Sequence, residues 1–381
     1  RSEIDRRPIP EYRAHTSGIG DQLLDGPFSV LVRPGVEGVV MVASAASPPG
    51  WVTHPWVEES AADVRFGVAN GPRGDWPALS EFVVALEELG FDSFWSSDHP
   101  VPSAGCWTTL AGLAATTKRI RLGSLVACVY YQNPVVLART ALDVDAMSGG
   151  RLVVGLGIGD IEREFVQMGI PWRSTPERQE ALDEAIGLLR YLWGEDPAPP
   201  APKHFAVSAS PLQPGPAQLP RIPLLIAGGG EKVTLRQVAQ HADASNFGEH
   251  VYTGGVQGEE AIGRRIAVLD RYSQTFGRPS ASVLRTHTTY PLVIAKTAGY
   301  LTEKIERFVP LWVRDLARDA IVAGTPTDVI AHFERLMRAG LQHFIAFVYG
   351  NDVETIRLLA EEVVPEVRRL KSETETVAVV R

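Results

Sequence analysis

The residues best suited to do chemistry are polar side chains that directly follow apolar, strand-like segments. Asp98 and His99 end the segment 91–100, and Asp160 follows the segment 151–159. A histidine titrates near neutral pH, so it can act as a general acid or base. Asp98 is expected to orient its loop, and Asp160 is suited to cap the helix that follows it. If the fold brings these strand ends together, these polar side chains are candidates for an active site.

Two clusters of glycine lie at similar positions, one in "GLGIG" at 155–159 and one at 228–230. The first cluster resembles a dinucleotide-binding turn, but it reads G-x-G-x-G in mid-chain rather than G-x-G-x-x-G after an opening strand. Glycine tolerates positive φ and allows close approach of a backbone. The clusters therefore indicate either anion-binding loops or tight strand-to-helix turns.

These positions need a scaffold, and from Val64 onward strand-like segments alternate with amphipathic helical patterns. The predicted strands are 64–70, 91–100, 121–129, 151–159, 221–230, 243–248, 283–295 and 341–349. The predicted helices are 76–90, 106–120, 133–150, 176–194, 231–242, 257–275, 327–340 and 353–370. This alternation is typical of a parallel sheet with crossover helices.

The repeat predicts an α/β fold, a (β/α)8 TIM barrel over residues 64–370 with its active site at the carboxyl ends of the strands. An open doubly wound sheet is the alternative, and the lack of a dinucleotide fingerprint disfavours it. Residues 1–63 are rich in Pro, Gly and Ser and are assigned to an N-terminal extension, and residues 371–381 to a frayed tail.

Composition narrows the class of partner. A net charge of −8 and a pI near 5.7 argue against nucleic acid or an anionic membrane as partner, and favour a small molecule. The two cysteines, Cys106 and Cys128, do not form a C-x-x-C motif, so neither disulfides nor a thiolate zinc site is indicated. Without a long apolar run or a secretion signal, we expect a cytoplasmic protein. No H-x-H motif supports a metal-dependent barrel hydrolase.

Five blocks occur in unbroken order: "LGFDSFWSSDH", "RIRLGSLV", "NPVVLARTALDVDAMSGGRLVVGLGIGD", "ERQEALDEAIGLLRYLWG" and "IPLLIAGGG" followed by "AQHADASNFG". Together they resemble the bacterial luciferase-like superfamily, which comprises monooxygenases that use reduced FMN and oxidoreductases that use the deazaflavin coenzyme F420. The family fold is a (β/α)8 barrel, in agreement with the repeat pattern.

The resemblance implies a flavin site in the barrel mouth. It places His99 beside the flavin ring and a non-proline cis peptide near Leu125 and Val126. It also aligns Asp160 with a glutamate that donates a proton in sugar-phosphate-oxidising deazaflavin enzymes. The tryptophan that those enzymes keep after the histidine is absent from residues 100–103, which counts against sugar-phosphate chemistry. The cofactor-binding residues that we expect are Asp98, Leu125, Val126, Ile158, Gly159, Gly228, Gly229, Gly230 and Gly248.

On this basis the sequence favours a flavin-dependent monooxygenase that uses reduced FMN and dioxygen on a small organic substrate. The alternatives are F420-dependent hydride transfer and a non-catalytic flavin-binding protein. The resemblance also implies a homodimer, and a flavin reductase as a possible supplier of reduced cofactor. Five side chains could line a substrate pocket or could serve only for packing: Trp107, Tyr130, Tyr131, His287 and Tyr290.

Overall fold

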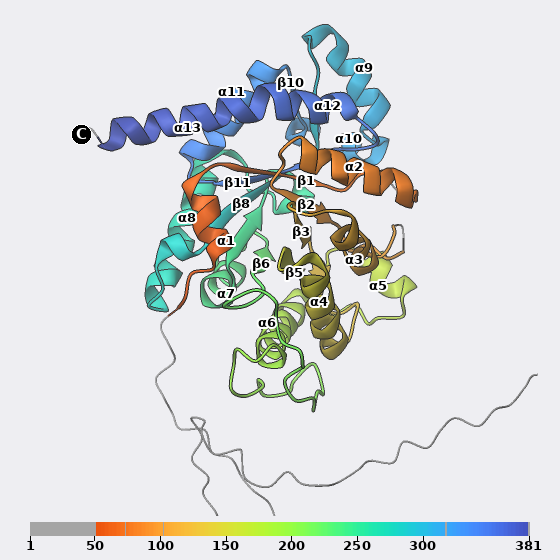
Figure 1. Cartoon of the computed structure of the whole chain (residues 1–381), viewed down its shortest axis with the longest axis vertical. Coiled ribbons are helices and arrows are strands. Elements are labelled where there is room, and N and C mark those ends of the chain that lie inside the picture. Colours follow the sequence, from red (N-terminus) through yellow and green to blue (C-terminus); the bar gives the residue numbers. More distant parts are fainter. Residues whose placement is uncertain (1–50, 73, 102, 317, 380–381) are drawn as a thin grey trace, which may run out of the picture. The chain divides into compact units, whose positions relative to one another are not determined.

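A closed parallel barrel forms the core of the computed structural model, which describes residues 51–72, 74–101, 103–316 and 318–379 (Figure 1). Its strands are β1 (Arg65–Ala69), β2 (Ser93–Ser96), β3 (Arg121–Ser124), β4 (Ala127–Cys128), β5 (Leu152–Gly157), β6 (Leu224–Ala227), β7 (Ala244–Phe247), β8 (Leu284–Thr289) and β11 (His343–Phe347). They pair in the order β3-β2-β1-β11-β8-β7-β6-β5-β4, and β5 also pairs with β3. Because β4 continues β3, the ring has eight positions, and the predicted (β/α)8 fold is confirmed.

Helices follow most strands and cover the outside of the ring. They are α1 (Pro55–Ala62), α2 (Trp76–Glu88), α3 (Cys106–Thr116), α4 (Pro134–Ser148), α5 (Glu162–Gln167), α6 (Thr175–Leu192), α7 (Thr234–His241), α8 (Gly258–Thr275), α9 (Ala298–Phe308), α10 (Leu311–Leu316), α11 (Pro326–Arg338), α12 (Val353–Leu358) and α13 (Val364–Val379). Several begin at side-chain caps: Ser174 and Glu177 form a capping box at the start of α6, and Asp75 accepts a bond from the Ala78 amide at the start of α2. Within the described residues, no helix is long and apolar enough to cross a membrane.

Side chains of alternate strand residues fill two separate layers. The outward layer packs under the helices, and the lumen is filled by a second cluster that includes Trp95, Val153, Leu225 and Ile345. Trp95 is fully buried, and its ring occupies the space beside Gly123, where a Cβ would lie 2.3 Å from the ring. The large side chain of Trp95 thus fits because the neighbouring residue, Gly123, has no side chain.

The domain begins earlier in the sequence than predicted. Residues 51–63, which we assigned to the extension, pack on the barrel, and Trp56 and Val57 are buried. The His54 ring caps α1 by accepting from the Trp56 amide and contacts the Arg221 carbonyl oxygen at 3.1 Å. Trp51 lies 3.5 Å from the Arg278 guanidinium, measured to the ring centroid. Because residues 51–63 show no strand-like pattern, the sequence analysis did not predict the partly buried helix α1 within them. The rest of the extension, residues 1–50, lies outside the described residues.

Two further boundaries differ from the predictions. The strand expected over 283–295 is divided at Tyr290 and Pro291, and its second part, β9 (Leu292–Ile294), pairs outside the barrel with β10 (Val322–Gly324). Between β9 and β10 lie α9 and α10, neither of which was predicted. The frayed tail was expected from residue 371, whereas within the described residues α13 continues to Val379, and no Gly or Pro after Pro365 ends it earlier.

Because His54 is buried, we predict that the free energy of unfolding of the barrel falls in acid. Burial lowers the pKa of His54 from its usual 6.5 to about 4. The contribution of the neutral ring to the free energy of unfolding is therefore complete above pH 6.5 and is lost as the pH falls toward 4. We expect His54→Asn, which keeps a capping side chain, to reduce the loss of unfolding free energy over this range by about 2–3 kcal/mol.

Urea unfolding at several pH values between 7.5 and 4.5 would measure this difference. An m-value that does not change with pH or with the substitution is the control that one transition is compared throughout. Equal pH dependence in the variant and the parent protein would show that His54 is not held neutral by the fold.

Candidate active site

The structure brings three of the predicted polar residues to neighbouring strand ends. Asp98 and His99 follow β2, and Asp160 follows β5. These strands are linked in the ring through β3 and β4, since β3 pairs with both β2 and β5, and β4 pairs with β5. The predicted proton-transfer residues therefore share one side of the barrel mouth.

His99 is held by a carboxylate that the sequence analysis did not identify. Its Nδ1 lies 3.0 Å from both Oε1 and Oε2 of Glu164, and Glu164 is 4% exposed. The Tyr131 hydroxyl donates to the same carboxylate at 3.1 Å. An ionised carboxylate only accepts hydrogen bonds, so Nδ1 carries the proton and Nε2 of the neutral ring is left as a proton acceptor. This arrangement fixes the orientation of the His99 ring, and a ring held in this way can act as a general base.

The two aspartates beside His99 both have raised pKa values. Asp98 accepts a bond from the Cys128 amide at 3.2 Å, which ties the end of β2 to β4. Burial raises the pKa of Asp98 to about 6, so its charge changes near neutral pH. Burial of the Asp160 carboxyl group away from water raises its pKa, although its electrostatic interaction with His99 lowers this pKa. Asp160 does not cap α5, because Ile161 holds the N-cap position.

The glycines of β5 serve close packing rather than phosphate binding. A Cβ at Gly155 would lie 2.0 Å from the Ser124 carbonyl oxygen, and one at Gly157 would lie 2.7 Å from Val126 Cγ2. Both positions are on the strand face toward β3 and β4, where the Leu125–Val126 peptide bond is cis, at the place that the resemblance implied. Ser124 Oγ donates to the Gly155 carbonyl oxygen at 2.9 Å and accepts from its amide at 3.0 Å.

Gly159 occupies a different environment beyond the end of β5. Its φ of +73° lies in the left-handed region, and a Cβ there would lie 2.6 Å from the Phe165 ring. The Arg178 guanidinium donates to the Gly159 carbonyl oxygen and to that of Ile158, and lies 3.8 Å from the Trp172 ring centroid. Arg178, also missed in the sequence, therefore fixes the turn that carries Ile158 and Gly159 to the mouth.

The remaining glycines divide into two pairs. The Gly228 amide donates to the Asn246 carbonyl oxygen at 2.8 Å and the Gly248 amide to that of Thr253 at 2.5 Å, so neither amide is free for a ligand. The amides of Gly229 and Gly230 have no acceptor within the described part of the chain. Gly228 and Gly248 stay predicted cofactor-binding residues, but their amides are already used by strand pairing and by a local turn.

The loop from Gly229 can bind an anion, although not through the helix end that we expected. The helix predicted from residue 231 begins at Thr234, and residues 231–233 form a turn. Glu231 in that turn is paired with Arg264 and Arg265, and Arg265 Nε also donates to the Gly229 carbonyl oxygen at 2.9 Å. Two free amides beside a guanidinium form a suitable site for a phosphate group.

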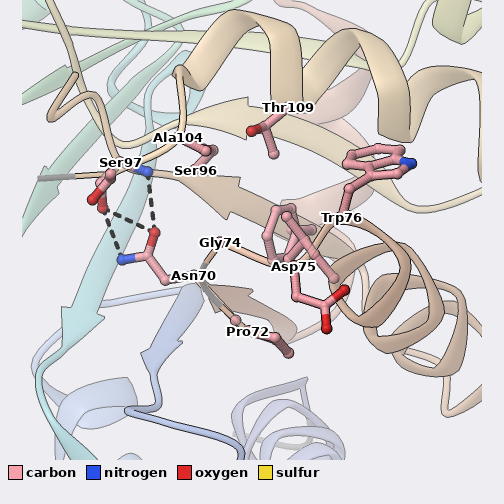
Figure 2. Close-up of a pocket in the computed structure, with 13 residues that line it drawn as sticks. Asn70, Pro72, Gly74, Asp75, Trp76, Ser96, Ser97, Ala104 and Thr109 are labelled. Atoms are coloured by element: carbon pink, nitrogen blue, oxygen red, sulfur yellow. Dashed lines mark hydrogen bonds between the residues drawn. The ribbon is translucent and has the colours of Figure 1, made fainter. Parts of the chain in front are cut away.

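A cavity of about 250 Å³ lies at the ends of β1 and β2, bordered by α2 and α3 (Figure 2). Figure 2 shows Asn70 and Ser97 joined by hydrogen bonds at one edge of it, with Trp76 from α2 and Thr109 from α3 at another edge. Asn70 has a φ of +59°, and its side chain exchanges hydrogen bonds with Ser97. None of the predicted site residues lines this cavity.

The candidate pocket residues have different roles. His287 lies on the outward face of β8, with its ring centroid 6.4 Å from that of His332, so of its two expected roles the structure supports packing. Neighbouring strand residues alternate between faces, and a sequence does not show which face is inward. Trp107 is buried under the helices, and Tyr130 packs on Phe165. Tyr290 belongs to the lumen cluster.

A signal for Glu164 was present in the sequence. Glu164 follows Asp160 by four residues in "DIERE", a spacing that corresponds to about one helical turn. What the spacing could not show is that Glu164 is buried and that its partner His99 lies 65 positions away.

Comparison with known proteins agrees with this arrangement. Residues 60–311 match the family model described as luciferase-like monooxygenase. The chain is 28% identical to a protein of Amycolatopsis mediterranei (strain U-32) named F420-dependent glucose-6-phosphate dehydrogenase, over 79% of this chain and 96% of the relative.

Solved structures share the fold. An F420-dependent secondary alcohol dehydrogenase, solved in complex with an F420-acetone adduct, gives a TM-score of 0.67 at 20% identity and covers 80% of this chain and 99% of its own. A long-chain alkane monooxygenase gives 0.64 at 15% identity and covers 81% and 92%. The barrel and the matched span together confirm the resemblance: the chain belongs to the luciferase-like family of oxidoreductases.

Proposed function

We propose that the protein is an F420-dependent oxidoreductase that transfers a hydride between the deazaflavin and a small organic substrate. The observation that carries the proposal is the oriented His99, whose Nδ1 is bound by Glu164 and whose Nε2 is left to exchange a proton with substrate. A hydride transfer to or from an alcohol or ketone requires such a proton acceptor or donor at the substrate oxygen.

The relatives favour deazaflavin over FMN. The protein of Amycolatopsis mediterranei, like a second relative from Kineococcus radiotolerans, has a name that includes F420 dependence, and each matches more than three quarters of this chain. The fold does not discriminate, since the structural neighbours include both F420 enzymes and monooxygenases. The sequence analysis favoured reduced FMN with dioxygen, and that reaction becomes the alternative that the binding experiment below tests.

Residues of this chain can hold the cofactor. The free amides of Gly229 and Gly230 with Arg265 would bind its phosphate, and the turn at Ile158 and Gly159 would border its ring system. When bound, the deazaflavin supplies a ring carbon that accepts or returns a hydride. The Glu164 carboxylate would keep the Nδ1 proton of His99 in place, so that Nε2 takes the proton from a substrate hydroxyl.

A cofactor titration tests the assignment. We expect oxidised F420 to bind the purified full-length protein at least tenfold more tightly than FMN, with both followed by their own fluorescence. Gly229→Ala should weaken F420 binding about tenfold or more, because a Cβ there would lie 2.5 Å from Val256 Cγ2 and would displace the free amides.

Gly263→Ala is the matched control, since a Cβ at this helical glycine meets nothing within 4 Å. Preferential binding of FMN would favour oxygen chemistry and overturn the deazaflavin assignment. Equal effects of the two glycine substitutions would show that the loop at Gly229 is not the phosphate site.

The positioning role of Glu164 has a separate test. In Glu164→Leu, the Nδ1–H of His99 loses its acceptor, so the tautomer with the proton on Nε2 should gain population. Two-bond 1H–15N spectra of the His99 ring would show this shift without any substrate. With F420 and any substrate that it oxidises, kcat should fall about 100-fold while KM and the F420 Kd stay within about twofold.

The control is Glu162→Leu, which changes an exposed glutamate of the same helix. If both variants show the parent tautomer and the same kcat, Glu164 does not position His99.

A further inference from the structure

Six aromatic side chains form a continuous set of ring contacts on one side of the barrel mouth, and we call them the aromatic wall. They are His250, Tyr252, Tyr290, Trp312, Phe347 and Tyr349. Their ring centroids lie between 4.6 Å (Tyr290 and Phe347) and 6.4 Å (Trp312 and Tyr349) apart. Such distances are typical of favourable aromatic pairs.

The wall borders the expected position of the cofactor. Tyr290, Phe347 and Tyr349 belong to the lumen cluster against which Leu125 and Val126 also pack. The wall arises from the ends of β7, β8 and β11 and from α10, and β7 lies four positions from β2 around the ring. It therefore lies across the barrel mouth from His99, which follows β2.

Exposure increases along the wall toward solvent. The three lumen members are at most 9% exposed, whereas Tyr252 and Trp312 are 43% and 54% exposed. Small-molecule sites are lined mainly by apolar and aromatic side chains with a few polar groups that fix orientation. A graded aromatic surface across the mouth from the proton acceptor is suited to the apolar body of a substrate.

His250 supplies a polar group within this surface. It is 1% exposed, and its Nδ1 accepts from the Tyr252 amide at 3.1 Å. Burial lowers the pKa of His250, so the ring is neutral and its proton is on Nε2. This Nε2 is buried without an acceptor within the described residues. A buried donor without a partner is destabilising, and a hydrogen bond to a ligand oxygen would remove that cost.

Two cations of this side are paired with carboxylates. Arg335 is paired with Glu249 at 3.0 Å, and the buried Lys304 is paired with Asp352 at 2.9 Å. Arg314 on α10 has a buried Nε without an acceptor within the described residues, so its guanidinium could bind an anionic substrate. The six rings of the wall favour a substrate with an aromatic or apolar body, and an anionic probe in the test below decides whether Arg314 sets the charge of the substrate instead.

We propose that the aromatic wall binds the substrate, an uncharged secondary alcohol or its ketone with an aromatic or apolar body, and that His250 donates from Nε2 to a second oxygen of that body. The inference rests on the proposed function and narrows its substrate class. In oxidation, the C–H bond at the alcohol carbon breaks, and its electron pair and hydrogen pass as hydride to oxidised deazaflavin. The hydroxyl proton passes to His99 Nε2, and the ketone remains.

The experiment compares 1-(4-methoxyphenyl)ethanol with glucose 6-phosphate as probes. Calorimetric titration of the full-length protein, with and without F420, measures binding, and the loss of F420 absorbance measures oxidation. We expect the methoxyphenyl alcohol to bind and glucose 6-phosphate not to bind. Trp312→Ala and His250→Phe should each weaken binding of the alcohol at least fivefold.

Trp76→Ala is the matched control, because Trp76 is also an exposed helical tryptophan, at 43%, and lies on α2. All three variants should keep the F420 Kd and the Tm of the parent protein, so that a weakened alcohol Kd reports the wall and not the fold.

Each outcome decides between the subsite and the cofactor assignment. Trp312-dependent binding of the alcohol without binding of F420 would keep the wall and overturn the proposed function. Binding of F420 with no binding of the alcohol would keep the function and overturn the wall. Binding of glucose 6-phosphate that is lost in Arg314→Gln would assign the region to an anionic substrate and would also overturn the wall.

Discussion

Closure of the barrel between β3 and β5 is the constraint on which the site depends. A side chain at Gly155 would meet the Ser124 carbonyl oxygen at 2.0 Å, so only glycine permits the two strands to pair there. Beyond this contact the chain passes through Leu125 and Val126 into β4, which pairs with β5 and presents the Cys128 amide to Asp98. The glycine run that resembles a nucleotide-binding turn is therefore the place where the barrel closes. The placement of the carboxylates around His99 follows from this closure.

Some residues of the candidate site are held in place by hydrogen bonds, whereas others have polar groups that are left without a partner. Glu164 and Arg178 are buried and saturated with hydrogen bonds, and they set the positions of His99 and of the turn at Gly159. In contrast, His99 Nε2 and the Gly229 amide are left without partners in the described chain. Groups that would touch a ligand are thus held through their neighbours, which keeps their orientation before any ligand arrives.

The sequence was sufficient to predict the barrel, because the alternation and the order of strands and helices can be recognised without knowing how the side chains pack. The strand ends at His99 and Asp160 could be located, and the resemblance placed the cis bond at Leu125 and Val126 correctly. Three kinds of fact stayed out of reach. The partner of His99 lies on another element, the inward face of β8 could not be distinguished from its outward face, and the amides of Gly228 and Gly248 are used by residues whose positions only the folded chain defines.

The insertion between β9 and β10 has a consequence for how such an enzyme could change. Residues 295–321 carry Trp312 and leave the barrel between two strands that pair with each other, Leu292–Ile294 with Val322–Gly324. Their own pairing closes the base of the segment, so its length and content can vary while the eight-position ring and the histidine with its carboxylate stay intact. Evolution or protein design could therefore exchange this segment and change the substrate specificity, while the residues proposed to carry out the reaction stay in place.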